Sequence, residues 1–271
     1  MPSLPARGQA VRELGLPLPP ARMPLVRGRR PLKRWRYVGV YGPDLMLCIG
    51  DARVAGLPRR WWAVALPDGT LRERTTSGRG GVTVGPGRAR VAARDVRIEL
   101  ELAEGPGVEV VSPHGSSYIW TRKQAAVPAR GAVELDGTRF EIDGPAFVDD
   151  SAGYHARRTM WRWSAGTGRG ENGEQLAWNL VEGVHDAAEA SERTVWMDGD
   201  PVEVGPVEFA ADLARVGGLR FSAWSAREHD TRLGLFRSRY RQPFGTFAGE
   251  LPNGVRLAAG YGVMEWHDVR W

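Results

Sequence analysis

The hydrophobic pattern along most of this chain is one of short strands. From about Trp35 onward, apolar residues alternate with polar ones or form brief apolar runs, and Gly, Pro, Asp or Asn interrupts them every eight to twelve residues. Segments such as "GVTVG", "VEVVSP" and "RTVWMDGDPVEV" are typical of antiparallel β-structure. About fifteen such segments follow one another, so the chain is predicted to be all-β.

Asp-Gly pairs mark the turns between several of these strands. The pairs at 68–69, 136–137 and 198–199 each stand between two strand-like runs, where a tight hairpin needs the left-handed backbone that Asp and Gly tolerate. Only residues 206–216, "PVEFAADLARV", offer a plausible helix. There is no strand–helix–strand unit and no glycine-rich phosphate loop, so no cofactor of the dinucleotide type is expected.

The number of strands exceeds what one eight-stranded barrel holds. The predicted fold is therefore two antiparallel β-barrels, or two strongly curved sheets, packed together. We expect an extended arm rich in Pro and Arg over residues 1–31, an N-terminal barrel-like domain over 32–146 and a C-terminal one over 147–271. Prolines are too frequent in the arm for a helix or an interior strand, and the arm is expected to lie over the body, where it could cover a sheet edge.

The net charge of +5 is concentrated at the N-terminus. Residues 1–36 hold nine basic side chains and one acidic one, so the rest of the chain is mildly acidic. No nucleic-acid motif accompanies these charges, and a solvated basic arm is favoured over contact with an acidic partner or a membrane surface. A single cysteine, Cys48, excludes an internal disulfide. With neither a long apolar run nor a secretory signal, the chain is expected to be soluble and cytoplasmic.

Residues 149–163, "DDSAGYHARRTMWRW", bring together acidic, aromatic and histidine side chains. We expect "DDSAG" to be a loop that leads into a strand. Side chains alternate in a strand, so His155, Trp161 and Trp163 would share one face while Tyr154 lies on the other. Core packing of the indoles, and turn chemistry for the two aspartates, remain the alternative interpretations.

Three other strands carry candidate side chains. "QLAWNLVEGVHD" is the expected hairpin partner of the strand after residue 155, and it places Trp178 and Glu182 on one face. "FRSRYRQPFGTFAG" places Tyr240 and Gln242 on one face, and the last strand does the same for Glu265 and His267. The five histidines include no His-X-His pair and no HExxH helix, so no metal is expected.

An apolar wall raises the pKa of a carboxyl and keeps its proton available near neutrality, which suits a general acid. The candidate catalytic residues are Asp150, Glu182, His155 and Tyr154. Asp150 or Glu182 would donate the proton, and Tyr154 and His155 would orient the polar end of a ligand. The candidate ligand-binding residues are Asp149, Trp161, Trp163, Trp178, Tyr240, Gln242, Glu265 and His267. Indole faces would stabilise cationic character in the ligand.

The chain resembles, from about Leu32 onward, a bacterial family defined only as a domain of unknown function, number 2804. The stretches that carry this resemblance are "RPLKRWRYVGVYGPDLMLCIGDARV", "DDSAGYHARRTMWRWSAG", "WNLVEGVHDAAEASERTVWMDG", "RYRQPFGTFAGELP" and "GYGVMEWHDVRW". The segment at 149–163 is also similar, more remotely, to the double lipocalin-like group that includes carotenoid hydratases, tocopherol cyclase and some pericyclase-type cyclases. That likeness implies two lipocalin-like barrels, an elongated apolar ligand, and chemistry without a redox cofactor.

The sequence thus predicts a protein that binds a hydrophobic small molecule of isoprenoid, fatty acyl or polyketide type. As an enzyme it would catalyse acid-assisted hydration, cyclisation or isomerisation without a cofactor. The alternatives are a lipid carrier that uses the same walls without turnover, and a carbohydrate-binding or carbohydrate-active β protein, since indoles beside carboxylates also suit sugar rings.

Overall fold

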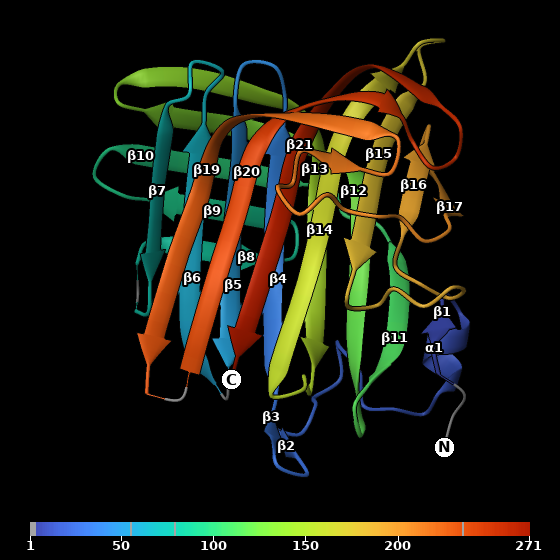
Figure 1. Cartoon of the computed structure of the whole chain (residues 1–271). Coiled ribbons are helices and arrows are strands. Elements are labelled where there is room, and N and C mark those ends of the chain that lie inside the picture. Colours follow the sequence, from blue (N-terminus) through green and yellow to red (C-terminus); the bar gives the residue numbers. More distant parts are fainter. Residues whose placement is uncertain (1–3, 55, 79, 235) are drawn as a thin grey trace.

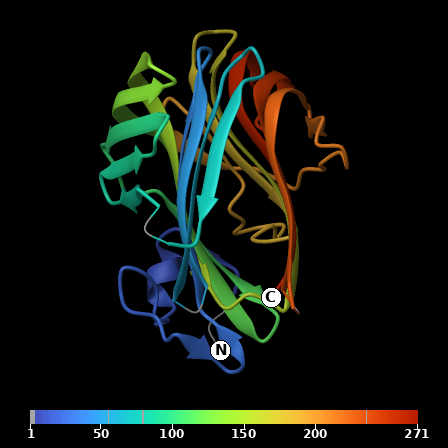
Figure 2. The ribbon, with the colours of Figure 1, turned by 90° about the vertical axis from the view of Figure 1, so that its left-hand side faces the viewer.

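The computed structural model describes residues 4–54, 56–78, 80–234 and 236–271, and most of these lie in antiparallel β-strands (Figure 1). Two large sheets face each other across an apolar layer, as the view in Figure 2 shows. The predicted all-β class is confirmed. Its cause is the alternation of the sequence, which gives each strand one face for the layer between the sheets.

The first sheet contains eleven of the described strands, in the order β7-β6-β5-β4-β13-β12-β10-β9-β8, with β11 beside β12 and β1 beside β11. Its strands are β1 (Ala6–Arg7), β4 (Lys33–Tyr41), β5 (Met46–Val54), β6 (Leu57–Ala65), β7 (Leu71–Thr76), β8 (Val82–Gly85), β9 (Arg88–Ala92), β10 (Val96–Leu102), β11 (Val108–His114), β12 (Ser117–Leu135) and β13 (Thr138–Gly153).

The second sheet contains eight of the described strands, in the order β17-β16-β15-β14-β21-β20-β19-β18. Its strands are β14 (Arg158–Gly170), β15 (Gln175–Glu182), β16 (Thr194–Met197), β17 (Asp200–Glu203), β18 (Arg215–Val216), β19 (Leu219–Leu233), β20 (Phe236–Glu250) and β21 (Arg256–Arg270). Within the described residues neither sheet closes on itself. Of the two predicted arrangements, the pair of closed barrels is therefore wrong, and the pair of open sheets packed together is found. Each sheet buries its inner face against the other sheet, which replaces the packing inside a barrel.

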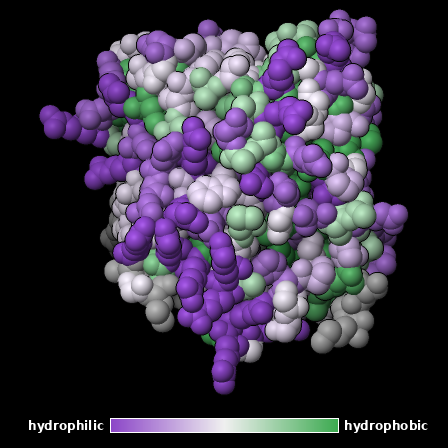
Figure 3. Space-filling view, in the orientation of Figure 1, coloured by the Kyte–Doolittle hydropathy of each residue, from purple (hydrophilic) through white to green (hydrophobic). Residues whose placement is uncertain are grey.

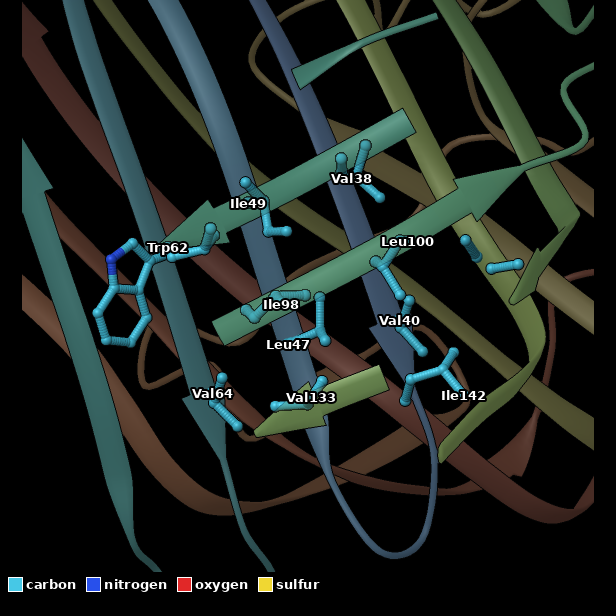
Figure 4. Packing of buried hydrophobic residues seen from close by; sticks show 14 of the residues in the cluster. Val38, Val40, Leu47, Ile49, Trp62, Val64, Ile98, Leu100, Val133 and Ile142 are labelled. Carbon is cyan, nitrogen blue, oxygen red and sulfur yellow. The ribbon is translucent and has the colours of Figure 1, made fainter. Parts of the chain in front are cut away.

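The first sheet folds over on itself. A bulge between Gln124 and Val127 interrupts the pairing of β12 with β13. Beyond the bulge, the second part of β12 pairs with β10, and β8, β9 and β10 lie across the outer face of β4, β5 and β6. Figure 4 shows the apolar cluster between these layers, where Ile49 and Leu47 of β5 meet Ile98 of β10. This second core holds β4–β6 rigid from behind.

The layer between the two sheets is apolar at its centre. Tyr37 and Phe147 of the first sheet pack against Trp163, Phe244 and Val263 of the second. The rings of Tyr37 and Trp163 meet edge to face, with centroids 5.5 Å apart. Tyr37 and Trp163 of this core also form part of the wall of a cavity between the sheets.

The described part of the N-terminal segment covers one end of the first sheet. β1 pairs with the edge strand β11, and the short helix α1 (Ala10–Glu13) follows it. Val11, Leu18 and Met23 are buried against β11 and β12. The hairpin of β2 (Val26–Arg27) and β3 (Arg30–Pro31) projects at the lower end of the molecule in Figure 1.

Two local predictions are wrong. Residues 149–153 are the last part of β13 rather than a loop, because they pair with β4 and β12 on both sides. Residues 206–216 contain no helix: Leu213 has a left-handed φ of 64°, and the apolar residues of this segment pack individually over the outer face of the second sheet.

The predicted hairpins at 68–69, 136–137 and 198–199 are confirmed, and the last two have positive φ at both positions. In the described ranges no helix is long and apolar enough to cross a membrane. The division of the chain into domains near Phe147 stays a prediction.

Candidate functional site

A cavity of about 380 Å³ lies between the two sheets, at the end where β4 and β14 begin. Its walls are formed mainly by alternate residues of β4, β5, β6, β12 and β13 from the first sheet and of β14, β19, β20 and β21 from the second. Most of these side chains are aromatic or aliphatic, and a few polar ones converge at two places. This volume and this lining are typical of a site for a small, largely apolar molecule.

The register of β14, β20 and β21 determines which side chains meet in the cavity. Residues directly opposite each other in neighbouring strands share a face. Trp161 is opposite His267, Trp163 is opposite Glu265, and His267 is also opposite Tyr240. Five side chains from three strands are thereby brought to one wall.

Glu265 is the first polar centre. Its Oε1 accepts a hydrogen bond of 2.7 Å from Nε1 of Trp161, and its Oε2 accepts bonds from Tyr240 Oη at 3.0 Å and Gln242 Nε2 at 3.1 Å. Burial raises the pKa of Glu265 to about 7, although the bonds from Trp161 and Tyr240 oppose that rise. The carboxyl is therefore close to half protonated at neutral pH, and it faces the cavity.

The second polar centre is a buried cluster around Lys123. Lys123 Nζ lies 2.7 Å from Asp149 Oδ1 and 3.5 Å from Glu192 Oε2. Burial alone would lower the pKa of Lys123, but Asp149 and Glu192 outweigh it and the pKa is raised. Burial, with Asp149 nearby, raises the pKa of Glu192 to about 7. The cluster thus holds one cation, one anion and one readily protonated carboxyl.

Two parallel indoles connect the two polar centres. The rings of Trp35 in β4 and Trp161 in β14 are 3° from parallel, with centroids 6.4 Å apart. Trp35 Nε1 donates to Asp149 Oδ2 at 3.3 Å, whereas Trp161 donates to Glu265. Each indole is thus fixed by a different carboxyl group, and both indoles line the cavity.

The histidines of the cavity are uncharged at neutral pH. Burial lowers the pKa of His267 to about 3 and that of His229 to about 4, and it lowers the pKa values of His155 and His185 well below the usual range. His267 Nε2 and Ser238 Oγ are 2.8 Å apart. His155 lines the same cavity, although its Nδ1 is itself fully buried.

Most of the residues singled out from the sequence meet in this cavity. Those that line it are Asp149, His155, Trp161, Trp163, Tyr240, Glu265 and His267. Gln242 stands behind them, since it holds the carboxyl of Glu265. Their functional roles remain predictions. Alternation grouped His155 with Trp161 and Trp163, and Glu265 with His267, whereas Asp149 reaches the cavity from the facing sheet.

Asp150 and Tyr154 lie outside the cavity. Residues 149 and 150 are neighbours in β13 and point to opposite faces, so Asp150 is on the outer surface, where Arg36 and Arg122 each bond it at 2.8 Å. Tyr154 is buried beneath the N-terminal segment and donates to the carbonyl of Pro24 at 2.8 Å. Neither side chain can touch a molecule in the cavity.

Trp178 and Glu182 also lie outside, because register places the other face of β15 toward the cavity. Trp163 is opposite Val181, so the residues on either side of Val181 point away. Trp178 packs against Phe247, with ring centroids 5.0 Å apart. Glu182 is half-buried on the outer surface and pairs with Arg162 at 3.1 Å.

The sequence analysis missed Trp35, Lys123, Glu192 and Arg227, all of which line the cavity. Arg227 joins the two sheets, since its Nε donates to Glu73 of β7 at 2.7 Å. One signal was available: Lys123 is one of only two lysines in a chain that otherwise uses arginine, and it is buried. Unlike the guanidinium of arginine, the lysine side chain carries a compact ammonium group.

The described residues do not bring three His, Cys, Asp or Glu side chains together as a metal-binding group. The cavity's polar atoms gather in two clusters, one around the Glu265 carboxyl and one in which Lys123 meets Asp149 and Glu192. What this arrangement can do is hold a polar group of an otherwise apolar molecule beside a carboxyl that exchanges a proton near neutral pH.

Solved structures with a similar fold exist, although sequence identity to them is low. A crystal structure described as an AttH candidate from Nitrosomonas europaea is 15% identical, with a TM-score of 0.50 over 86% of this chain and 91% of the other. Kievitone hydratase from Nectria haematococca is 10% identical, with a TM-score of 0.50 over 88% of each chain. At these identities the likeness concerns the fold alone.

No curated protein is significantly similar to the chain in sequence. Residues 75–271 match the family described as Domain of unknown function (DUF2804). The match includes β14, β20 and β21, which supply Glu265 and its three hydrogen-bond donors. Because it spans more than half of the chain, the protein belongs to the DUF2804 family.

Proposed function

We propose that the protein binds a hydrophobic small molecule in the cavity between its sheets and exchanges a proton with it through Glu265. The observation that carries this proposal is a buried carboxyl with a pKa of about 7, facing an apolar cavity and held by Trp161, Tyr240 and Gln242. A general acid is most effective when its pKa lies near the working pH. The reaction would be a hydration, cyclisation or isomerisation that needs no cofactor.

The hydrogen bonds of Glu265 leave room for the proton that it would donate. Oε1 accepts one bond and Oε2 accepts two, so a proton on Oε1 is not blocked by the neighbouring donors. Cationic character that develops on a protonated ligand would lie against the indoles of Trp35 and Trp161, which line the cavity and whose π systems stabilise positive charge. The Glu265 carboxylate left after donation, with its pKa of about 7, would take a proton back, whereas His267, with a pKa of about 3, is too weak a base for this step.

The cluster around Lys123 would orient the ligand. Lys123 offers a hydrogen-bond donor at the wall formed by the first sheet, opposite the sheet that carries Glu265. A ligand with one polar group and an apolar body would place that group here and its reacting carbon near Glu265. Neither Asp150 nor Glu182 has a role in this scheme.

Binding is tested with N-phenyl-1-naphthylamine, a neutral apolar fluorophore. The wild-type protein should bind it, and Ala52→Trp, which fills the cavity wall, should abolish binding. Ala188→Trp, in an exposed turn, is the matched control and should bind as the wild type does. Equal fluorescence in both variants would place the probe elsewhere and refute the cavity as the binding site.

Proton exchange is tested on whatever small molecule is extracted from the purified protein. In deuterated water the wild type should introduce deuterium at carbon, detected by mass spectrometry, and Glu265→Gln should slow this by at least about 100-fold. Glu182→Gln is the matched control and should be unchanged. Retention of the molecule without any deuterium incorporation would make the protein a carrier and exclude the catalytic role.

A further inference from the structure

The cavity opens at one end of the molecule through an apolar rim. Leu57 lines the cavity and is also 75% exposed, so it stands at the opening. Val54 is directly opposite Leu57, and Phe236 and Trp271 line the same end from the second sheet. In Figure 1 these strand ends and the C-terminus are all at the lower end.

Further exposed apolar side chains lie at this end, on the β2–β3 hairpin. Leu25 and Val26 are each 57% exposed, and the hairpin projects beyond the two sheets in both ribbon views (Figure 1, Figure 2). Arg30 of the hairpin donates to the carbonyl of His114 at 2.6 Å, and the His114 ring lies 5.6 Å from that of His155 in the cavity. The hairpin is therefore attached next to the opening.

Arginines form a row at the same end of the molecule, on the outer face of the second sheet. Register places Arg158, Arg270, Arg237 and Arg232 side by side across the ends of β14, β21, β20 and β19. Asp268 and Asp230 compensate only part of this charge. In the space-filling view, hydrophilic residues cover the lower part of the molecule and its lower projection, where the hairpin lies (Figure 3).

Several exposed arginines at this end form no ion pair with a carboxylate in the described part of the chain, among them Arg27 and Arg29 in the hairpin, Arg34 in β4 and Arg270 in β21. Arg34 and Arg270 are neighbours of cavity residues in their strands, so they lie on the outer faces of the two sheets. An unpaired cation on a soluble surface adds little to stability. At the same end as the apolar opening, these cations form a surface complementary to anionic headgroups above an apolar phase.

We propose that this end of the molecule docks on an anionic membrane surface. Leu25, Val26 and Leu57 would enter the interface while the arginines bind lipid headgroups, and the opening of the cavity would then face the bilayer. Entry of an apolar ligand from the bilayer rests on the function proposed above, but the docking itself does not. A soluble anionic ligand is the competing explanation for the arginines, and the exposed apolar residues favour the membrane.

Docking is tested with the full chain and vesicles of phosphatidylcholine with or without phosphatidylserine. Binding in a sedimentation assay should require phosphatidylserine and should weaken as salt increases. The triple variant Arg29→Gln/Arg34→Gln/Arg270→Gln should lose about fivefold in partition coefficient per arginine, or about 100-fold in all. The matched control, Arg88→Gln/Arg94→Gln/Arg130→Gln, lies on the folded-over strands away from the opening and should bind like the wild type.

The apolar contribution is tested separately by Leu25→Ser/Val26→Ser, which should weaken vesicle binding without changing its dependence on phosphatidylserine. Equal loss in the control triple variant, or no binding to phosphatidylserine vesicles at low salt, would refute docking. So would binding of a monomeric anionic detergent without binding of vesicles. Binding of N-phenyl-1-naphthylamine in solution should be unchanged in the arginine variants. This measurement therefore tests ligand binding in the cavity separately from docking on the membrane.

Discussion

Replacing Glu265 by glutamine should change how the stability of the protein depends on pH. Burial raises the pKa of Glu265 from 4.5 to about 7 in the folded protein. Between these two values the folded state binds more protons than the unfolded state, so the free energy of unfolding falls as pH rises from about 4.5 to about 7. Above that range the penalty is complete and constant.

The size of the effect follows from the two pKa values. The rise corresponds to about 3 kcal/mol, of which about 2.5 kcal/mol develops between pH 5 and pH 8. Glu265→Gln carries no titrating group, so the variant should gain about 2.5 kcal/mol relative to the wild type over this interval. The altered hydrogen bonds to Trp161 and Tyr240 add a constant offset and do not affect the change with pH.

Urea unfolding of both proteins at a series of pH values between 5 and 8 measures this difference directly. Glu182→Gln is the same chemical change on the outer surface, and its difference from the wild type should stay constant over the interval. A stability difference for Glu265→Gln that also stays constant would refute the raised pKa. The assignment of Glu265 as the proton donor would then fall with it.

Two further predictions concern stability alone. Lys123→Met leaves Asp149 and Glu192 buried without their cation, so it should lower the free energy of unfolding by about 3–5 kcal/mol in the same urea assay. The control Arg130→Met breaks only an exposed pair with Asp143 and should lower it by less than about 0.5 kcal/mol. Gly166→Ala brings a methyl group into the ring of Trp178 and should lower the free energy of unfolding by about 1–3 kcal/mol, measured by thermal unfolding. The control Gly144→Ala has open space around it and should leave the stability nearly unchanged. Equal losses of stability in the two variants would contradict the close packing of Trp178.

The strands, their hairpins and the grouping of side chains by face could be predicted from the sequence, because these depend on short-range patterns. Alternation alone placed Tyr240 with Gln242 and Glu265 with His267, and two Asp-Gly turns adopt the backbone expected of them. The same local reasoning failed at residues 149–153, where the Asp-Asp-Ser-Ala-Gly composition suggests a loop. Pairing with strands on both sides stabilises a strand there instead.

Which face of each strand turns inward was decided by tertiary structure. Trp178 and Glu182 share a face as predicted, but the pairing of Trp163 with Val181 turns that face outward. Likewise, two adjacent aspartates lie in different environments. Asp149 is buried beside Lys123, and Asp150 is paired with surface arginines.

The cavity itself is a product of long-range packing. Trp35 and Trp161 are far apart in the sequence and become parallel neighbours only when the two sheets face each other. Lys123 is directly opposite Asp149 in the β12–β13 pair, and it meets Glu192 from the segment between β15 and β16. The sequence determined the parts of the site because periodicity is local, whereas the site exists because register and sheet packing bring separate strands together.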